Sequence, residues 1–186
     1  MAGTFAVGDK LFKLEPRANG SHVLSQVKTT DPAPELDPIP VADVAGTADL
    51  SAETAVAADG GSTIDVLVAY TPKIASIYGA AGAEALVIQA VAEANQAYAN
   101  SGVAARLNLV KAVLTDYVES SSMNTDLSRL RATNDGYLDE LHSLRDEYGA
   151  DLVSLIADQS GYCGLAYRMT SLSTGFASSA FSLVHR

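Results

Sequence analysis

The chain has 186 residues, 48% of them hydrophobic and 18% charged, and this apolar content is enough to build a folded core. Twelve Lys and Arg face 22 Asp and Glu, for a formal net charge of −10. That balance argues against nucleic acid as the main partner, because phosphate binding depends on clustered Lys and Arg. No apolar stretch approaches the roughly 20 residues that a membrane-spanning helix needs, so no membrane partner is expected.

The first 28 residues are predicted to form a β-hairpin. Residues 10–14 alternate polar and apolar side chains as a half-buried strand does, and residues 22–27 can return as the second strand. Residues 16–20 are predicted to form the turn between them. An isolated hairpin is only marginally stable in water, so this one is expected to pack on another part of the chain.

Residues 29–63 are predicted to be a linker rich in Pro and Ala. Residues 31–40 contain four prolines, a composition typical of an extended linker. Residues 41–62 consist mainly of Ala, Asp, Thr and Gly without a clear period. Both a short helix from Ser51 and disorder therefore stay open for this part.

Four strands are predicted after the linker. The run 64–70 is short, apolar and β-branched, and it ends at Thr71 and Pro72, which favours a mostly buried strand. A loop rich in Gly, Ser and Tyr is predicted at residues 158–175, ahead of the last strand. The other strands are predicted at residues 106–114, 151–157 and 177–184.

Three helices are predicted between these strands. Residues 84–101 carry one polar stripe and one apolar face, and Gly102 stands where a helix-ending glycine is expected. Thr125 is predicted to cap a short helix, and Asp135 a second one that ends at Gly149. The apolar face of that last helix is expected to comprise Tyr137, Leu141, Leu144 and Tyr148.

The order of these elements predicts the fold class. Strands and helices alternate as β-α-β-α-α-β-loop-β, which is typical of a layered α/β domain. We expect a mainly parallel, twisted sheet of about four strands with packed helices, preceded by the hairpin and the linker.

Common nucleotide and metal motifs are absent. The turn Gly79-Ala-Ala-Gly82 is not followed by Gly-Lys-Ser/Thr and does not form G-x-G-x-x-G, so small residues for close packing are the favoured interpretation. No H-E-x-x-H begins at His22, His142 or His185. His142 stands between Asp139 and Asp146 on one helix face, which favours solvated ion pairs over a metal site.

A nucleophile and a base could come from Cys163 or Ser160 with His185. A reactive thiol needs a nearby cation or base, and Arg168 and His185 are candidates for that role. Cys163 is the single cysteine, which excludes a disulfide within this chain. A structural cysteine, or half of a disulfide, stays open beside the nucleophile.

Six short segments occur in one order along residues 64–186. They are residues 64–72, 92–102, 125–130, 151–155, 161–166 and 178–182. Together they resemble the bacterial reprolysin-like zinc metalloproteases of the metzincin kind, and are closest to the peptidyl-Asp metalloendopeptidases. Residues 1–28 resemble the tail of that family's propeptide, with residues 29–63 as the junction. The resemblance also implies a secreted protein.

The resemblance implies a zincin fold, in which residues 64–186 form the upper subdomain of a truncated metalloprotease domain. It also implies peptide-bond hydrolysis by a zinc-activated water, with an Asp-directed specificity. The zinc ligands and the general base are missing, so no catalytic or metal-binding residue is assigned. We expect an N-terminal fragment that ends before the zinc-binding motif and is inactive alone. Cys163 would then pair with a cysteine outside this chain.

The resemblance also implies a place for the substrate, which would be a peptide or protein. The fourth strand would be the edge of the sheet, and an extended peptide would add to it through main-chain hydrogen bonds. Ser178, Ser179, Ala180 and Phe181 are therefore the expected substrate-binding residues. A complete, non-catalytic α/β binding or regulatory module is the alternative.

Overall fold

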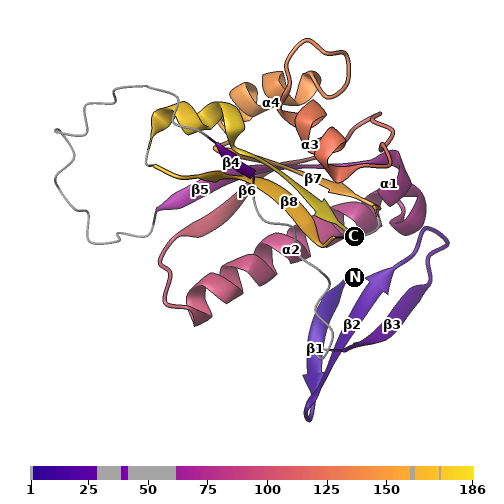
Figure 1. Ribbon diagram of the computed structural model, residues 1–186. Helices are drawn as coiled ribbons and strands as arrows, with labels where there is room; N and C mark the ends of the chain where they lie inside the picture. The colour runs from indigo at the N-terminus through magenta and orange to yellow at the C-terminus, as the bar shows by residue number, and fades with distance from the viewer. Residues whose placement is uncertain (1, 29–38, 42–61, 160–161, 172) are drawn as a thin grey trace.

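The computed structural model describes residues 2–28, 39–41, 62–159, 162–171 and 173–186. A large sheet lies at the centre with helices on both of its faces, and a smaller sheet lies beside α2 (Figure 1). None of the described helices is by itself long and apolar enough to cross a membrane. Only α1 and α2 together, bent by 101°, meet the requirement for length and composition.

The large sheet has six strands in the order β4-β8-β9-β7-β5-β6. The four strands from β9 to β6 are parallel to one another, whereas β8 is antiparallel to β9 and parallel to β4. This confirms the predicted α/β class, with two more strands than expected. The strands are β4 (Ile39–Val41), β5 (Thr63–Tyr70), β6 (Arg106–Leu114), β7 (Leu152–Ala157), β8 (Gly164–Met169) and β9 (Phe181–His185).

Alternate residues of β5 point to opposite faces of the sheet and help to build two hydrophobic cores. Val66 and Val68 pack under α1 (Pro72–Tyr78) and α2 (Ala80–Asn100). Leu67 packs on the other face, among residues that include side chains of α3 (Met123–Arg131) and α4 (Glu140–Tyr148). A strand that is buried on both faces explains why this run is apolar almost throughout.

The small sheet is antiparallel and consists of β1 (Gly3–Val7), β2 (Lys10–Pro16) and β3 (His22–Val27). The predicted hairpin is confirmed as β2 and β3, and β1 was missed. As expected, this sheet packs on the rest of the chain, since Thr4 Oγ1 donates a hydrogen bond of 2.6 Å to Glu93 Oε1 in α2.

Close packing also explains the two glycines that were weighed as a nucleotide turn. A Cβ on Gly82 would lie 3.1 Å from Pro16 Cγ of β2, and a Cβ on Gly79 would lie 3.4 Å from Ala18 Cα. Gly79 also has φ of 74°, which disfavours a side chain. The packing interpretation of this turn is therefore confirmed.

The helices differ from the prediction at their amino ends. Helix α1 was missed, because Thr71 and Pro72 serve as its cap and first residue as well as ending β5. Helix α2 begins at residue 80 instead of 84. Ser122 caps α3 in place of Thr125, since its Oγ accepts a hydrogen bond from Thr125 N.

Helix α4 is confirmed at its carboxyl end and corrected at its amino end. Gly149 adopts the left-handed conformation with φ of 63°, as predicted. The helix begins after Asp139, so the prediction of Asp135 as its cap was wrong. Tyr137 therefore lies outside the helix and is 44% exposed, whereas Leu138 takes the buried position.

The segment between β7 and β9 is more regular than predicted. It contains β8, and a 3-10 helix, η2 (Thr174–Ser179), that is capped by Ser173. The last strand therefore begins at Phe181, four residues later than expected. Strand β4 lies inside the predicted linker, whereas the possible helix from Ser51 lies outside the described residues.

Candidate functional site

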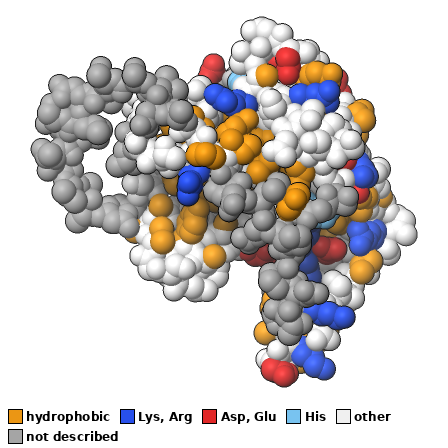
Figure 2. All heavy atoms as spheres, in the orientation of Figure 1, with side chains coloured by type: hydrophobic (Ala, Val, Ile, Leu, Met, Phe, Trp, Pro, Cys, Tyr) orange, Lys and Arg blue, Asp and Glu red, His pale blue; other side chains and the backbone are white. Residues whose placement is uncertain are grey.

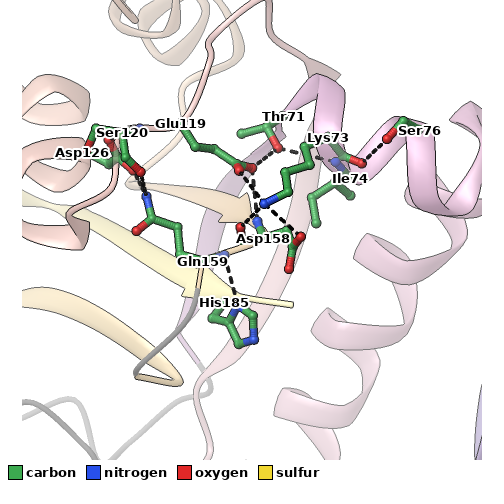
Figure 3. A network of polar contacts seen from close by, with 10 residues as sticks. All are labelled: Thr71, Lys73, Ile74, Ser76, Glu119, Ser120, Asp126, Asp158, Gln159 and His185. Carbon is green, nitrogen blue, oxygen red and sulfur yellow. Dashed lines mark hydrogen bonds and ion pairs between the residues drawn. The ribbon is translucent and has the colours of Figure 1, made fainter.

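A hollow of about 660 Å³ lies at the carboxyl ends of the parallel strands (Figure 3). Strands β6 and β7 pair with opposite edges of β5. The order in which successive strands are added to the sheet therefore reverses at β5. Open α/β sheets bind ligands in the crevice that such a reversal creates.

Lys73, at the start of α1, is paired with two carboxylates. Its Nζ lies 2.9 Å from Asp158 Oδ2 and 3.6 Å from Glu119 Oε2. The hydrogen bond to Asp158 is the main cause that raises the pKa of Lys73 above its ordinary value. The two carboxylates thus favour the protonated, positively charged form of Lys73.

Glu119 connects two strand ends. Its side chain is 7% exposed, and its Oε1 accepts hydrogen bonds from Thr71 Oγ1 and, at 3.0 Å, from Asp158 N. Thr71 follows β5 and Asp158 follows β7. This carboxylate therefore holds the ends of neighbouring strands together.

Asp126 is fully buried beside the same hollow and is well partnered. Its carboxylate accepts hydrogen bonds from Tyr117 Oη at 2.5 Å, from Ser120 N at 2.9 Å and from Gln159 Nε2. Burial, and then the hydrogen bond to Asp126, raise the pKa of Tyr117 to about 12. These groups satisfy one another, which is typical of a structural network.

His185 ends β9 and Cys163 lies just before β8, but the two form no side-chain pair in the described part of the chain. His185 N donates to Cys163 O at 2.9 Å, while His185 Nδ1 accepts from Gln159 N at 3.0 Å. The Cys163 side chain is exposed and is a free thiol. Arg168 lies further along β8, and Ser160 lies outside the described residues. Among the described candidates, Cys163, Arg168 and His185, the structure thus assembles no nucleophile with its base.

The predicted ion pairs of His142 were wrong within the described residues. The Asp139 carboxylate accepts hydrogen bonds from Gly136 N at 3.0 Å and Asp135 N at 3.3 Å instead. The imidazole ring of His142 turns toward Phe181, with the ring centres 5.1 Å apart.

The residues present do not fit a zinc ion. Nowhere in the described ranges do three or more His, Cys, Asp or Glu side chains lie together as a metal would require. His142 lies on α4 and His185 on β9, with different neighbours. No catalytic step through zinc can be derived from this chain.

The prediction that the last strand is an edge of the sheet was wrong. Strand β9 lies between β8 and β7, so it is not an edge of the sheet. Ser178 and Ser179 belong to η2, and Ala180 caps it. Ser179, Ala180 and Phe181 are at most 6% exposed, and Ser178 alone of the four is exposed. The alternation of residues 177–184 misled the prediction, because a capped 3-10 helix occupies its first half.

Strand β8 has the edge-like position that was expected of β9, and β4 covers it. Ile39 pairs with Tyr167 and Val41 with Met169, and Thr170 Oγ1 donates to Val41 O at 3.0 Å. Sequence reasoning missed β4 because it is short and contains Pro40. The signal for it is a proline between two β-branched residues, which an outer strand tolerates.

The parallel strands β9 to β6, the antiparallel β8 and the helices on both faces are consistent with a zincin-like metallopeptidase domain. The family model "Metallo-peptidase family M12B Reprolysin-like" matches residues 84–185, more than half of the chain. The chain therefore belongs to the reprolysin-like metallopeptidases.

Two curated relatives, both named peptidyl-Asp metalloendopeptidase, align with almost all of the chain. The protein of Xanthomonas campestris pv. campestris is 41% identical over 96% of this chain and 43% of its own length. That of Stenotrophomonas maltophilia (strain K279a) is 39% identical over the whole chain and 44% of its own length. The chain thus spans less than half the length of these relatives.

One solved structure supports the fold alone. It is titled "Structure of a chaperone-substrate complex" and matches 68% of this chain and 23% of its own chain, with a TM-score of 0.56 and 23% identity.

Proposed function

We propose that this chain is part of a zinc-dependent metalloendopeptidase with a preference for aspartate in its peptide substrate. The observation that carries the proposal is the reprolysin-like family match over residues 84–185. The aspartate preference is supported by the name of the two curated relatives alone.

We further propose that an extended peptide substrate pairs with β8. Peptides commonly add as a strand to an exposed sheet edge, because the main-chain hydrogen bonds are then satisfied. Two observations support the proposal: β8 lies outside β9, and its outer side already pairs with the short strand β4, whose position the peptide would take. This replaces the expectation for Ser178, Ser179, Ala180 and Phe181.

In this proposal the chain by itself neither holds zinc nor cleaves peptides. The sequence has three histidines and no H-E-x-x-H. The zinc ligands and the general base are assigned to residues that this chain does not contain. Secretion, a propeptide role for residues 1–28 and a linker role for residues 29–63 are proposed with it, and they rest on the resemblance.

A chimera tests the proposal. Residues 64–186 would replace the aligned part of the Xanthomonas campestris relative, and cleavage of a quenched fluorescent peptide would be measured with and without a zinc chelator. We expect chelator-sensitive cleavage by the chimera, and neither stoichiometric zinc nor cleavage from the 186-residue chain. A folded but inactive chimera, beside an active parent, would contradict the metalloendopeptidase proposal. Stoichiometric zinc with chelator-sensitive cleavage by the chain alone would contradict its inactivity.

A further inference from the structure

A second hollow, of about 390 Å³, lies at the opposite end of the sheet from the carboxyl-end network. It is bordered by α3, α4, η2 and the neighbouring ends of β8 and β9. None of its described lining residues is an Asp or a Glu. In Figure 2, Lys and Arg side chains border hydrophobic ones over the upper part of the molecule, where Figure 1 shows α4. The lining of the hollow includes Arg131, His142, Arg145, Tyr167, Ser178 and Phe181. We call this hollow the cationic pocket.

The two arginines of the cationic pocket are held in place without a counter-charge. Arg131 Nε donates to Ser178 O at 3.2 Å, and its guanidinium lies 5.0 Å from the centre of the Tyr167 ring. Arg145 donates to three backbone carbonyl oxygens and lies 5.3 Å from the centre of the Phe181 ring. Neither forms an ion pair with a carboxylate in the described part of the chain. Two fixed positive charges therefore face the hollow.

His142 adds an unpartnered donor or acceptor to the same pocket. Its Nε2 atom is buried and has no hydrogen-bond partner within the described ranges. A buried polar atom without a partner costs free energy, and a bound ligand that supplies the partner removes this cost. This one atom thus lacks a hydrogen-bond partner among the described residues, whereas the Asp126 carboxylate in the other pocket has several.

The pocket lies on the face to which a peptide along β8 would send every second side chain. Tyr167 borders the pocket and pairs with Ile39 of β4, and both side chains pack on the core under α3 and α4. Successive side chains of an extended strand point to opposite faces. A peptide that takes the position of β4 would therefore point one side chain to this face beside Tyr167.

We propose that the cationic pocket binds the carboxylate of an acidic side chain in a peptide that lies extended along β8. Guanidinium groups are the preferred partners of carboxylates, and a fixed pair of them selects the anion over its neutral amide analogue. The inference rests on the proposed function, because it takes a peptide as the ligand. It assigns a specificity role to Arg131, with Arg145 and His142 as supporting groups.

Binding to the 186-residue chain tests the inference without catalysis. The probes are two labelled, end-blocked peptides of Ala and Val, one with a central Asp and the other with Asn in its place. We expect the Asp peptide to bind about tenfold more tightly by fluorescence anisotropy, the size of effect typical of one charge-assisted hydrogen-bonding group. Arg131→Gln should abolish this preference, and Arg131→Lys should keep part of it.

Arg168→Gln is the matched control. It removes the same charge from the residue of β8 that follows Tyr167, which is exposed and points to the opposite face of the sheet from Tyr167. We expect this variant to keep the full preference for the Asp peptide. Melting temperatures of all variants would separate loss of binding from loss of folding.

The ratio of the two affinities is the decisive quantity, because β4 competes equally with both peptides. Equal binding of the two peptides by the unchanged chain would overturn the inference, and so would a failure of both to bind. A loss of preference in Arg168→Gln equal to that in Arg131→Gln would also overturn it, since general charge would then explain the effect. The chimera reports on hydrolysis separately, so either proposal can fail while the other stands.

Discussion

The two pockets at opposite ends of the large sheet differ in how their charged groups are paired. At the carboxyl end, Lys73, Glu119 and Asp126 all have charged or hydrogen-bonding partners within the chain. In the cationic pocket, Arg131 and Arg145 have no carboxylate partner in the described ranges, and His142 Nε2 has no partner. The polar groups of the larger pocket therefore stabilise the fold, whereas those of the smaller pocket retain charges that can pair with a ligand.

The largest expected effect is that of Asp126→Ala. The change leaves the buried donors of Tyr117, Ser120 and Gln159 without their acceptor. We expect a loss of about 3 kcal/mol in the free energy of unfolding, measured by urea denaturation. Asp116→Ala, in an exposed position of the loop between β6 and α3, should change stability by less than ~0.5 kcal/mol. Equal effects of the two substitutions on stability would contradict a structural role for the Asp126 network.

Tyr117→Phe should cost less, about 1–2 kcal/mol at neutral pH, because it removes one hydrogen bond to a buried carboxylate. It should also change the response to alkali. The pKa of Tyr117 is about 12 in the folded chain against an ordinary 10.0, so the phenol ionises more readily after unfolding. Stability that is fully present below pH 10.0 is therefore lost as the pH rises toward 12. The variant should lose less stability over that range in urea titrations at stepped pH, and identical slopes would contradict the assignment.

His142→Leu should increase the free energy of unfolding, in contrast to the two preceding substitutions. It replaces a partly buried ring whose Nε2 has no partner in the described residues by an apolar side chain beside Phe181. We expect the free energy of unfolding to rise by up to ~1 kcal/mol. His22→Leu, in an exposed position of β3, should give no such gain. A loss as large as that of Asp126→Ala would show that both pockets serve the fold.

The smallest effect is expected for Lys73→Met. The side chain is 55% exposed, and exposed ion pairs contribute little to stability. We expect a small decrease in melting temperature at low salt that disappears at high salt, because ions screen exposed charges. Lys10→Met, in an exposed position of β2 without a carboxylate partner in the described residues, should lack this salt dependence. A decrease in melting temperature that persists at high salt would contradict the assignment of Lys73 to exposed, screened ion pairs.

Local patterns predicted the elements whose signal is local. The buried runs of β5, β6 and β7 were found because apolar, β-branched stretches describe a strand wherever its partner lies. Gly149 was found because a left-handed residue ends a helix by its own conformation. Strands β1, β4 and β8 were missed because short or Gly-rich segments become strands only when a partner supplies the hydrogen bonds.

The candidate site was predicted less well than the fold. His142 was recognised as a residue of interest, but its helix neighbours suggested ion pairs, whereas its contact is Phe181 from another element. Arg131 and Arg145 were not singled out at all. Each is an ordinary arginine in the last turn of a helix, and only packing against β8 and β9 makes the pair unusual.

The α/β class, the acidic balance and the resemblance to reprolysin-like metallopeptidases could all be read from the amino-acid sequence. These properties depend on composition, periodicity and the order of short segments, which need no knowledge of distant contacts. Only the tertiary structure decided that β9 is an inner strand, that β4 covers β8, and that two arginines and a histidine share one pocket. The physical reason is that strand order, burial and charge pairing arise from contacts between residues far apart in the chain. Local periodicity carries no information about such contacts.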